Sequence, residues 1–180
     1  MGILLAFAPF IAFAVVDRIS GSTEGLVAGA VVSAALLLRD LIRGRTVRVL
    51  EIGTAILFGG LALYALLSRP SWSVIGVRLV VDVGLLLIVL ASLAIRRPFT
   101  LQYAWEQVAP ALWTSPEFVR TNYVITAVWA LAFAVMVTAE LVLLYMPGVP
   151  PRAGIIAIVL ALVGAVKFTG WYPERQRAGA

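Results

Sequence analysis

Long apolar stretches separated by short polar segments dominate the pattern along the chain. A helix needs about 20 apolar residues to cross the hydrocarbon core of a bilayer, which is roughly 30 Å thick. The pattern predicts six apolar helices, five or six of which cross, over residues 2–16, 22–38, 52–67, 74–95, 122–146 and 153–172. The expected fold class is all-α: a polytopic transmembrane helical bundle of five or six spans in one integral membrane domain, residues 1–180.

The first apolar run, residues 2–16, is shorter than the others and contains Pro9. A straight helix of that length falls short of the bilayer core. Ala12-Phe13-Ala14 is similar to a signal-peptidase site, but no Lys or Arg precedes the run, whereas a cleavable signal carries a positive n-region. We therefore expect a retained helix that is short, tilted or re-entrant, and five spans if it does not cross.

The segments between the spans give further expectations. Residues 17–24 form a polar turn, with Ser22 or Thr23 as the cap of the next helix. Between the fourth and fifth spans, residues 98–112 place apolar side chains on one helical face, which is typical of an amphipathic helix lying in the membrane interface. The apolar positions are Leu101, Ala104, Trp105, Val108 and Leu112, and Pro110 is expected to kink or end this helix.

The distribution of Lys and Arg predicts the orientation. With six spans and both termini inside, three arginines lie in the outer turns, namely Arg18, Arg69 and Arg152. Nine lie in cytoplasmic segments: Arg39, Arg43, Arg45, Arg48, Arg96, Arg97, Arg120, Arg175 and Arg177. Because basic residues favour the cytoplasmic side, we expect a multi-pass protein of the bacterial inner membrane with a cytoplasmic C-terminus.

Composition supports the membrane assignment and excludes several kinds of chemistry. Hydrophobic residues make up 62% of the 180 positions and charged residues 13%, far from the balance of a soluble domain. The net charge of +5 is explained by topology signals and anionic-lipid contacts, so no nucleic-acid partner is expected. There is no Cys or His, which excludes disulfides, Cys or His zinc sites and His-based triads. No catalytic, cofactor-binding or metal-binding residues are predicted.

Four ionisable residues fall inside predicted spans. Arg78 and Asp82 are spaced i and i+4 on one helix face, where a salt bridge within the helix is expected. Glu140 is expected to reach the interface or to pair with Lys167 or Arg152, and Lys167 to extend toward the interface. These charges either hold the helices together or act in a proton, ion or substrate pathway.

Small residues mark expected helix contacts at Gly25, Gly29, Gly59 and Gly60. Gly25 and Gly29 form a GxxxG pattern, which lets helices approach closely within one bundle or joins two copies in a homo-oligomer. Gly59 and Gly60 also fit a helix break of the kind that lines transport pathways.

Short apolar stretches carry a family resemblance. They are Phe7-Ala8-Pro9 to Val15, Phe58 to Tyr64, Arg96-Arg97-Pro98-Phe99, Trp113, and Trp129 to Phe133. The chain resembles the bacterial intracellular septation protein A family of small inner-membrane proteins over nearly its whole length. It departs from the family pattern at Thr126, where that family tends to have Asn, and the pair Arg78 and Asp82 does not map onto the family.

The resemblance implies a role in cell-envelope maintenance and division-associated wall synthesis, exerted through membrane partners without catalysis. The first hypothesis is therefore a non-enzymatic scaffold that binds other membrane proteins in the bilayer. The alternative is a small transporter or channel that uses the charged residues within its spans.

Overall fold

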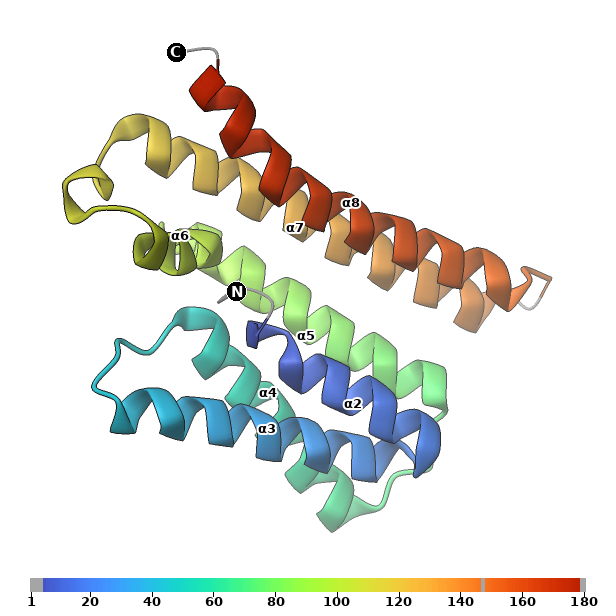
Figure 1. Cartoon of the computed structure of the whole chain (residues 1–180). Helices are drawn as coiled ribbons and strands as arrows, with labels where there is room; N and C mark the ends of the chain where they lie inside the picture. The colour runs from blue at the N-terminus through green and yellow to red at the C-terminus, as the bar shows by residue number, and fades with distance from the viewer. Residues whose placement is uncertain (1–4, 147, 179–180) are drawn as a thin grey trace. The chain divides into compact units, whose positions relative to one another are not determined.

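The computed structural model describes residues 5–146 and 148–178 and contains helices and no strand among them (Figure 1). In chain order the elements are α2 (Ala8–Ile19), α3 (Ser22–Ile42), α4 (Val49–Ser68), α5 (Val74–Ala94), α6 (Phe99–Ala104), η1 (Trp105–Gln107), η2 (Pro110–Leu112), α7 (Pro116–Tyr145) and α8 (Pro151–Ala178). Helices α3, α4, α5, α7 and α8 are long and apolar enough to cross a membrane. The predicted all-helical, multi-span fold is confirmed.

The chain forms two compact units, Met1–Ile88 and Val89–Ala180, and α5 runs through the boundary. In the N-terminal unit, α2 packs on α3 and α3 packs on α4. Its core is formed by buried apolar side chains from these three helices and α5: Phe13, Leu26, Phe58, Ala62, Ala65, Val77 and Val81. Each of these helices therefore buries one face inside the unit and leaves other apolar side chains exposed on its surface.

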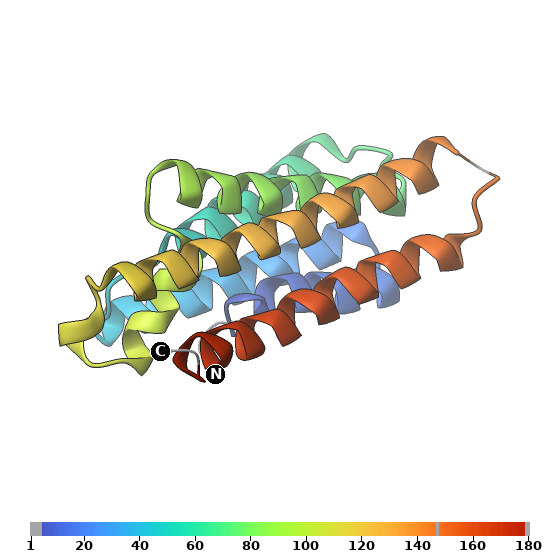
Figure 2. The same cartoon turned by 90° about the horizontal axis from the view of Figure 1, so that it is seen from above.

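The C-terminal unit is built on a hairpin of the two longest helices, α7 and α8, which lie side by side (Figures 1 and 2). Near the hairpin turn, a Cβ atom on Gly154 would lie 2.5 Å from a methyl carbon of Leu143, so the glycine permits close approach. Helix α6 packs on α7. The Trp129 ring contacts both Phe99 and Phe133, with its centroid 6.5 and 5.5 Å from theirs.

The first predicted span differs from the observed helix. Residues 2–4 of the predicted range lie outside the described residues, and α2 covers Ala8–Ile19. Its 12 residues extend about 18 Å at a rise of about 1.5 Å each, which is shorter than the bilayer core. The helix also continues past Val16, so Asp17 and Arg18 are helical and the turn predicted over 17–24 contains only two non-helical residues.

The predicted interfacial helix over 98–112 is shorter in the structure. Helix α6 ends at Ala104, and two single 3-10 turns follow. Val108 and Ala109 between the turns are extended, with ψ of 154° and 143°. Pro110 explains the conformation of Ala109, because a proline disfavours the helical region for the residue before it. The helix therefore does not reach Pro110, where a kink or end was predicted: α6 ends six residues earlier at Ala104, and Pro110 begins the second 3-10 turn.

Helix α7 begins at Pro116, six residues before the predicted start at Asn122. Its first turn carries three standard N-terminal signals: Ser115 accepts a hydrogen bond from the Phe118 amide, Pro116 occupies the first turn, and Glu117 follows. These signals are polar, so a prediction based on apolar periodicity placed the start too late. The gap between the predicted spans 52–67 and 74–95 agrees with the structure, where α4 ends at Ser68 and α5 begins at Val74.

Candidate functional site

An ion pair between two helices occupies the N-terminal unit. Arg78 of α5 donates from Nη2 and Nε to one carboxylate oxygen of Asp17 in α2, at 2.6 and 3.0 Å. The Asp17 side chain has no exposed surface, whereas 35% of the Arg78 side chain is exposed. A buried carboxylate of this kind is stable only when its charge is compensated and its oxygens accept hydrogen bonds.

The second carboxylate oxygen of Asp17 is also satisfied. Ser22, the first residue of α3, donates its hydroxyl to Asp17 Oδ1 at 2.7 Å. Close approach of α2 and α3 depends on Gly25, because a Cβ atom there would lie 2.9 Å from Asp17 Cβ and 3.0 Å from its backbone. Asp17 therefore joins three helices, and we name Asp17, Ser22 and Arg78 the clasp.

The clasp corrects two sequence predictions. Arg78 was expected to pair with Asp82 within α5, but among the described residues its ion pair is with Asp17. Ser22 or Thr23 was expected to cap α3, whereas the cap position is Gly21 and no side chain bonds there. Both predictions failed because Asp17 was assigned to a turn. Its place in the last part of α2 allows it to accept from both groups.

A second charged cluster lies where α3 leads into α4. Asp40 Oδ1 accepts from Arg39 Nη2 and Nε at 2.8 and 2.9 Å, and Arg48 Nη1 lies 3.7 Å from Asp40 Oδ2. Arg48 also donates to Glu51 at 2.7 Å, and Glu51 in turn accepts from the Arg48 backbone amide, which closes a capping box at the start of α4. The Asp40 side chain has no exposed surface.

The four arginines in and beside this loop fall into two groups, those paired with acids and those exposed. Arg39 and Arg48 are held by the acids Asp40 and Glu51, whereas Arg43 and Arg45 are exposed. All four arginines were predicted to be topology signals, and the neighbouring acids Asp40 and Glu51 were not singled out. The i, i+3 spacing of Arg48 and Glu51 was the available signal for the local pair.

The predicted contact glycines behave differently from one another. Gly29 lies against Phe58, since a Cβ atom there would be 2.5 Å from the ring, and Phe58 contacts Phe10 and Phe13 with centroids 5.0 and 5.7 Å away. The close contacts predicted at Gly59 and Gly60 are not found: apart from its chain neighbours and the backbone of α4 itself, a Cβ atom at either would meet no atom of the described residues within 4 Å. Helix α4 also runs through both residues without a break.

The glycines that bring α4 and α5 together were missed. A Cβ atom on Gly53 would lie 2.7 Å from Ile88, and one on Gly84 would lie 2.4 Å from Leu57. Both glycines receive a branched side chain from the facing helix. A single glycine among aliphatic residues does not carry the spaced pattern by which Gly25 and Gly29 were recognised.

In the C-terminal unit, Glu140 was predicted to pair with Lys167 or Arg152. Glu140 is buried in α7, whereas Lys167 and Arg152 on α8 are exposed. In the described part of the chain neither basic residue forms an ion pair, so the predicted pairing of Glu140 with Lys167 or Arg152 is not found.

Hydroxyl groups connect the helices of this unit. The Thr100 and Thr126 hydroxyls lie 2.7 Å apart, and Thr100 also donates to the Asn122 carbonyl at 2.9 Å. Trp129 Nε1 donates to the Thr169 hydroxyl at 3.0 Å, which links α7 to α8. Thr126, the position that departs from the resembled family, thus has a partner on α6.

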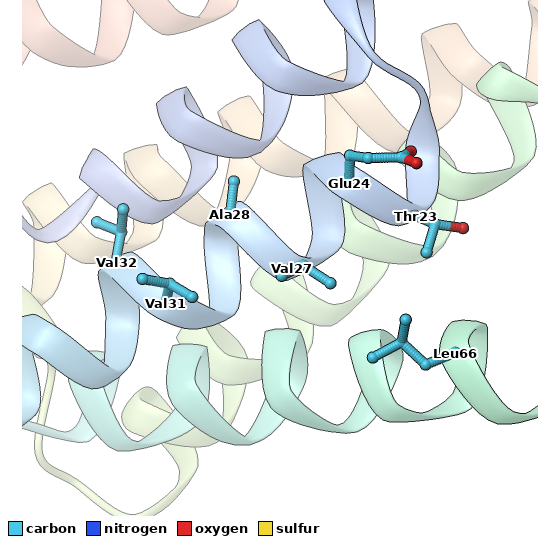
Figure 3. Close-up of a pocket in the computed structure, with 7 residues that line it drawn as sticks. All are labelled: Thr23, Glu24, Val27, Ala28, Val31, Val32 and Leu66. Atoms are coloured by element: carbon cyan, nitrogen blue, oxygen red, sulfur yellow. The ribbon is translucent and has the colours of Figure 1, made fainter.

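An open apolar groove runs along α3 in the N-terminal unit (Figure 3). Its volume is about 450 Å³, and it is lined by Thr23, Glu24, Val27, Ala28, Val31 and Val32 from α3 and by Leu66 from α4. None of Arg78, Asp82, Glu140 and Lys167 lines it. The groove therefore has one polar end and an apolar floor, and it is separate from the clasp.

No protein-family model, curated protein or solved structure matches this chain. The resemblance to the septation protein A family accordingly stays a prediction from the sequence.

Proposed function

We propose that this protein is a non-enzymatic scaffold of the bacterial inner membrane that binds other membrane proteins in cell-envelope maintenance or septation. The observation that supports the proposal is that ion pairs join helices to one another in the N-terminal unit. Arg78 joins α5 to α2, and Arg48 lies between acids on α3 and α4. These charges hold helices in a fixed arrangement, which is what a binding surface requires.

The second support is the family resemblance over nearly the whole chain, which implies action through membrane partners. The apolar side chains that face outward from the spans supply the contact area for such partners within the bilayer. Examples are Ile56 on α4 and Val159 on α8, which are 70% and 50% exposed. Partner helices in membranes bind through close packing of such surfaces, because lipid and protein side chains are equally apolar.

In-membrane crosslinking tests the scaffold. A photoreactive amino acid at Ile56 or Val159 should capture membrane proteins of envelope synthesis or division in living cells. Matched probes at the buried positions Phe58 and Phe133 and in an unrelated five-span protein provide the background. If neither exposed position enriches an envelope or division protein above that background, the scaffold hypothesis is wrong.

We further propose that the C-terminus and the loop containing Arg43 and Arg45 are cytoplasmic. The turns before α3, before α5 and before α8 then lie on the opposite side, in agreement with the nine-to-three bias of basic residues. A reporter fused after Arg177 should be active as a cytoplasmic fusion, and one at Arg69 or Arg152 as a periplasmic fusion. The reverse pattern would overturn this orientation.

A small transporter or channel is the second candidate, and Asp82 is the observation that favours it. Asp82 lies half-buried in α5, one helical turn after Arg78, and among the described residues it has no hydrogen-bond or ion-pair partner. An ionisable group inside a span is costly unless it is paired or functional. Proton or ion flux into vesicles, compared between wild type and Asp82→Asn, separates this candidate from the scaffold.

A further inference from the structure

The groove along α3 has the two features of a binding site for an amphiphile, an apolar floor and a polar end. Val27, Ala28, Val31, Val32 and Leu66 form its apolar floor. Its volume of about 450 Å³ lies within the range of roughly 300–1,000 Å³ that is typical of small-molecule sites. Both helices that line it are long and apolar enough to span a membrane, so the groove lies along segments that cross the depth of the lipid chains.

The polar end of the groove carries one negative charge. Thr23 and Glu24 lie in the first turn of α3, and Figure 3 shows their side chains at the same end of the groove. Glu24 is exposed, and its carboxylate has no hydrogen-bond or ion-pair partner among the residues that the structure describes. The end of a spanning helix lies near the headgroup region of the bilayer.

We propose that the groove binds one phospholipid with a primary ammonium headgroup, that is, phosphatidylethanolamine. One acyl chain lies on the apolar floor, and the ammonium group donates to the Glu24 carboxylate with the Thr23 hydroxyl beside it. A primary ammonium supplies three N–H donors for a charge-assisted hydrogen bond. Choline has no N–H, and the glycerol headgroup of phosphatidylglycerol has no positive charge, so both fit this end less well.

Glu24 also has a structural role that the test must separate from lipid binding. An acidic side chain in the first turn of a helix is favourable because of the partial positive charge there. Glu117 is the matched control, because it is exposed and lies in the first turn of α7. A change at Glu117 removes the same interaction with a helix N-terminus without touching the groove.

The experiment is native mass spectrometry of the full chain released from nanodiscs made of equal amounts of phosphatidylethanolamine and phosphatidylglycerol. Wild type should retain one phosphatidylethanolamine in preference to phosphatidylglycerol. Glu24→Gln should lower that preference about two- to fivefold, which is the effect of one exposed ion pair. Glu117→Gln should leave the preference unchanged.

Variants that fill the groove with a larger side chain provide a second test of lipid binding. Ala28→Phe should reduce retention of both lipids, whereas Ala91→Phe, at an exposed alanine of α5, should not. Val31→Trp repeats the test at a position that is 61% exposed, so the larger side chain does not displace core residues.

Three outcomes would overturn the proposal. The first is unchanged lipid retention in Ala28→Phe and Val31→Trp, which would place no lipid in the groove. The second is an equal loss of both lipids in Glu24→Gln, which would remove the headgroup assignment. The third is a dimer in wild type that Val31→Trp dissociates, which would identify a second copy of the chain as the occupant. All three readouts are independent of the partners sought by crosslinking.

Discussion

Asp17→Asn and Arg78→Gln are each expected to destabilise the protein strongly, and Asp82→Asn is expected to have a small effect. Removing one partner of a buried ion pair leaves the other charge uncompensated, which costs roughly 3 to 5 kcal/mol. Because 35% of the Arg78 side chain is exposed, we expect a loss near the lower end, about 3 kcal/mol. The measurement is the folded yield and the thermal midpoint in detergent, followed by tryptophan fluorescence.

The double variant Asp17→Asn/Arg78→Gln should recover much of the loss, because removing both charges also removes the burial penalty. Asp82→Asn is the matched control, since Asp82 lies one turn from Arg78 on the same helix. If Asp82→Asn is as damaging as Asp17→Asn, the pair within α5 governs stability and the clasp does not.

The same variants separate the scaffold from the transporter. A transporter that uses Asp82 should lose proton or ion flux into vesicles in Asp82→Asn while its folded yield stays normal. A scaffold should keep its crosslinking pattern in that variant. If wild-type vesicles show a flux that disappears in Asp82→Asn, the transporter candidate replaces the scaffold.

Asp40→Ala is the second change with a large expected effect. The Asp40 side chain has no exposed surface and lies between Arg39 and Arg48. Its removal leaves buried positive charge at Arg48 with one acid, Glu51, where the native cluster has two. We expect a loss of about 3 kcal/mol, within the range for broken buried charge pairs, and a loop over residues 43–48 that proteases cleave more readily.

Arg43→Ala is the control for Asp40→Ala. Arg43 is exposed in the same loop and forms no ion pair among the described residues. A surface change of this kind alters stability by about 0.5 kcal/mol or less. Equal thermal midpoints for Asp40→Ala and Arg43→Ala would show that the buried cluster does not stabilise the α3–α4 connection.

The sequence by itself determined the approximate positions of the five long apolar helices, whereas it left open whether the first, shorter run also crosses. Each span is a local property, because the backbone of a membrane segment must satisfy its hydrogen bonds within its own helix. The turn over residues 68–73 was equally predictable, since Pro70 and the polar residues around it interrupt two apolar runs. The polar starts of α4 and α7 were less visible, because their capping residues do not follow the apolar period.

The tertiary structure alone decided which charges and which glycines meet. Arg78 had a sequence neighbour of opposite charge at i+4, yet its partner Asp17 lies 61 residues away. The glycines in Gly25–Gly29 and Gly59–Gly60 looked alike as small residues, but Gly29 lies against Phe58 and Gly59 meets no neighbour. Local spacing predicts which residues share a helix face, whereas the packing of the helices decides what that face contacts.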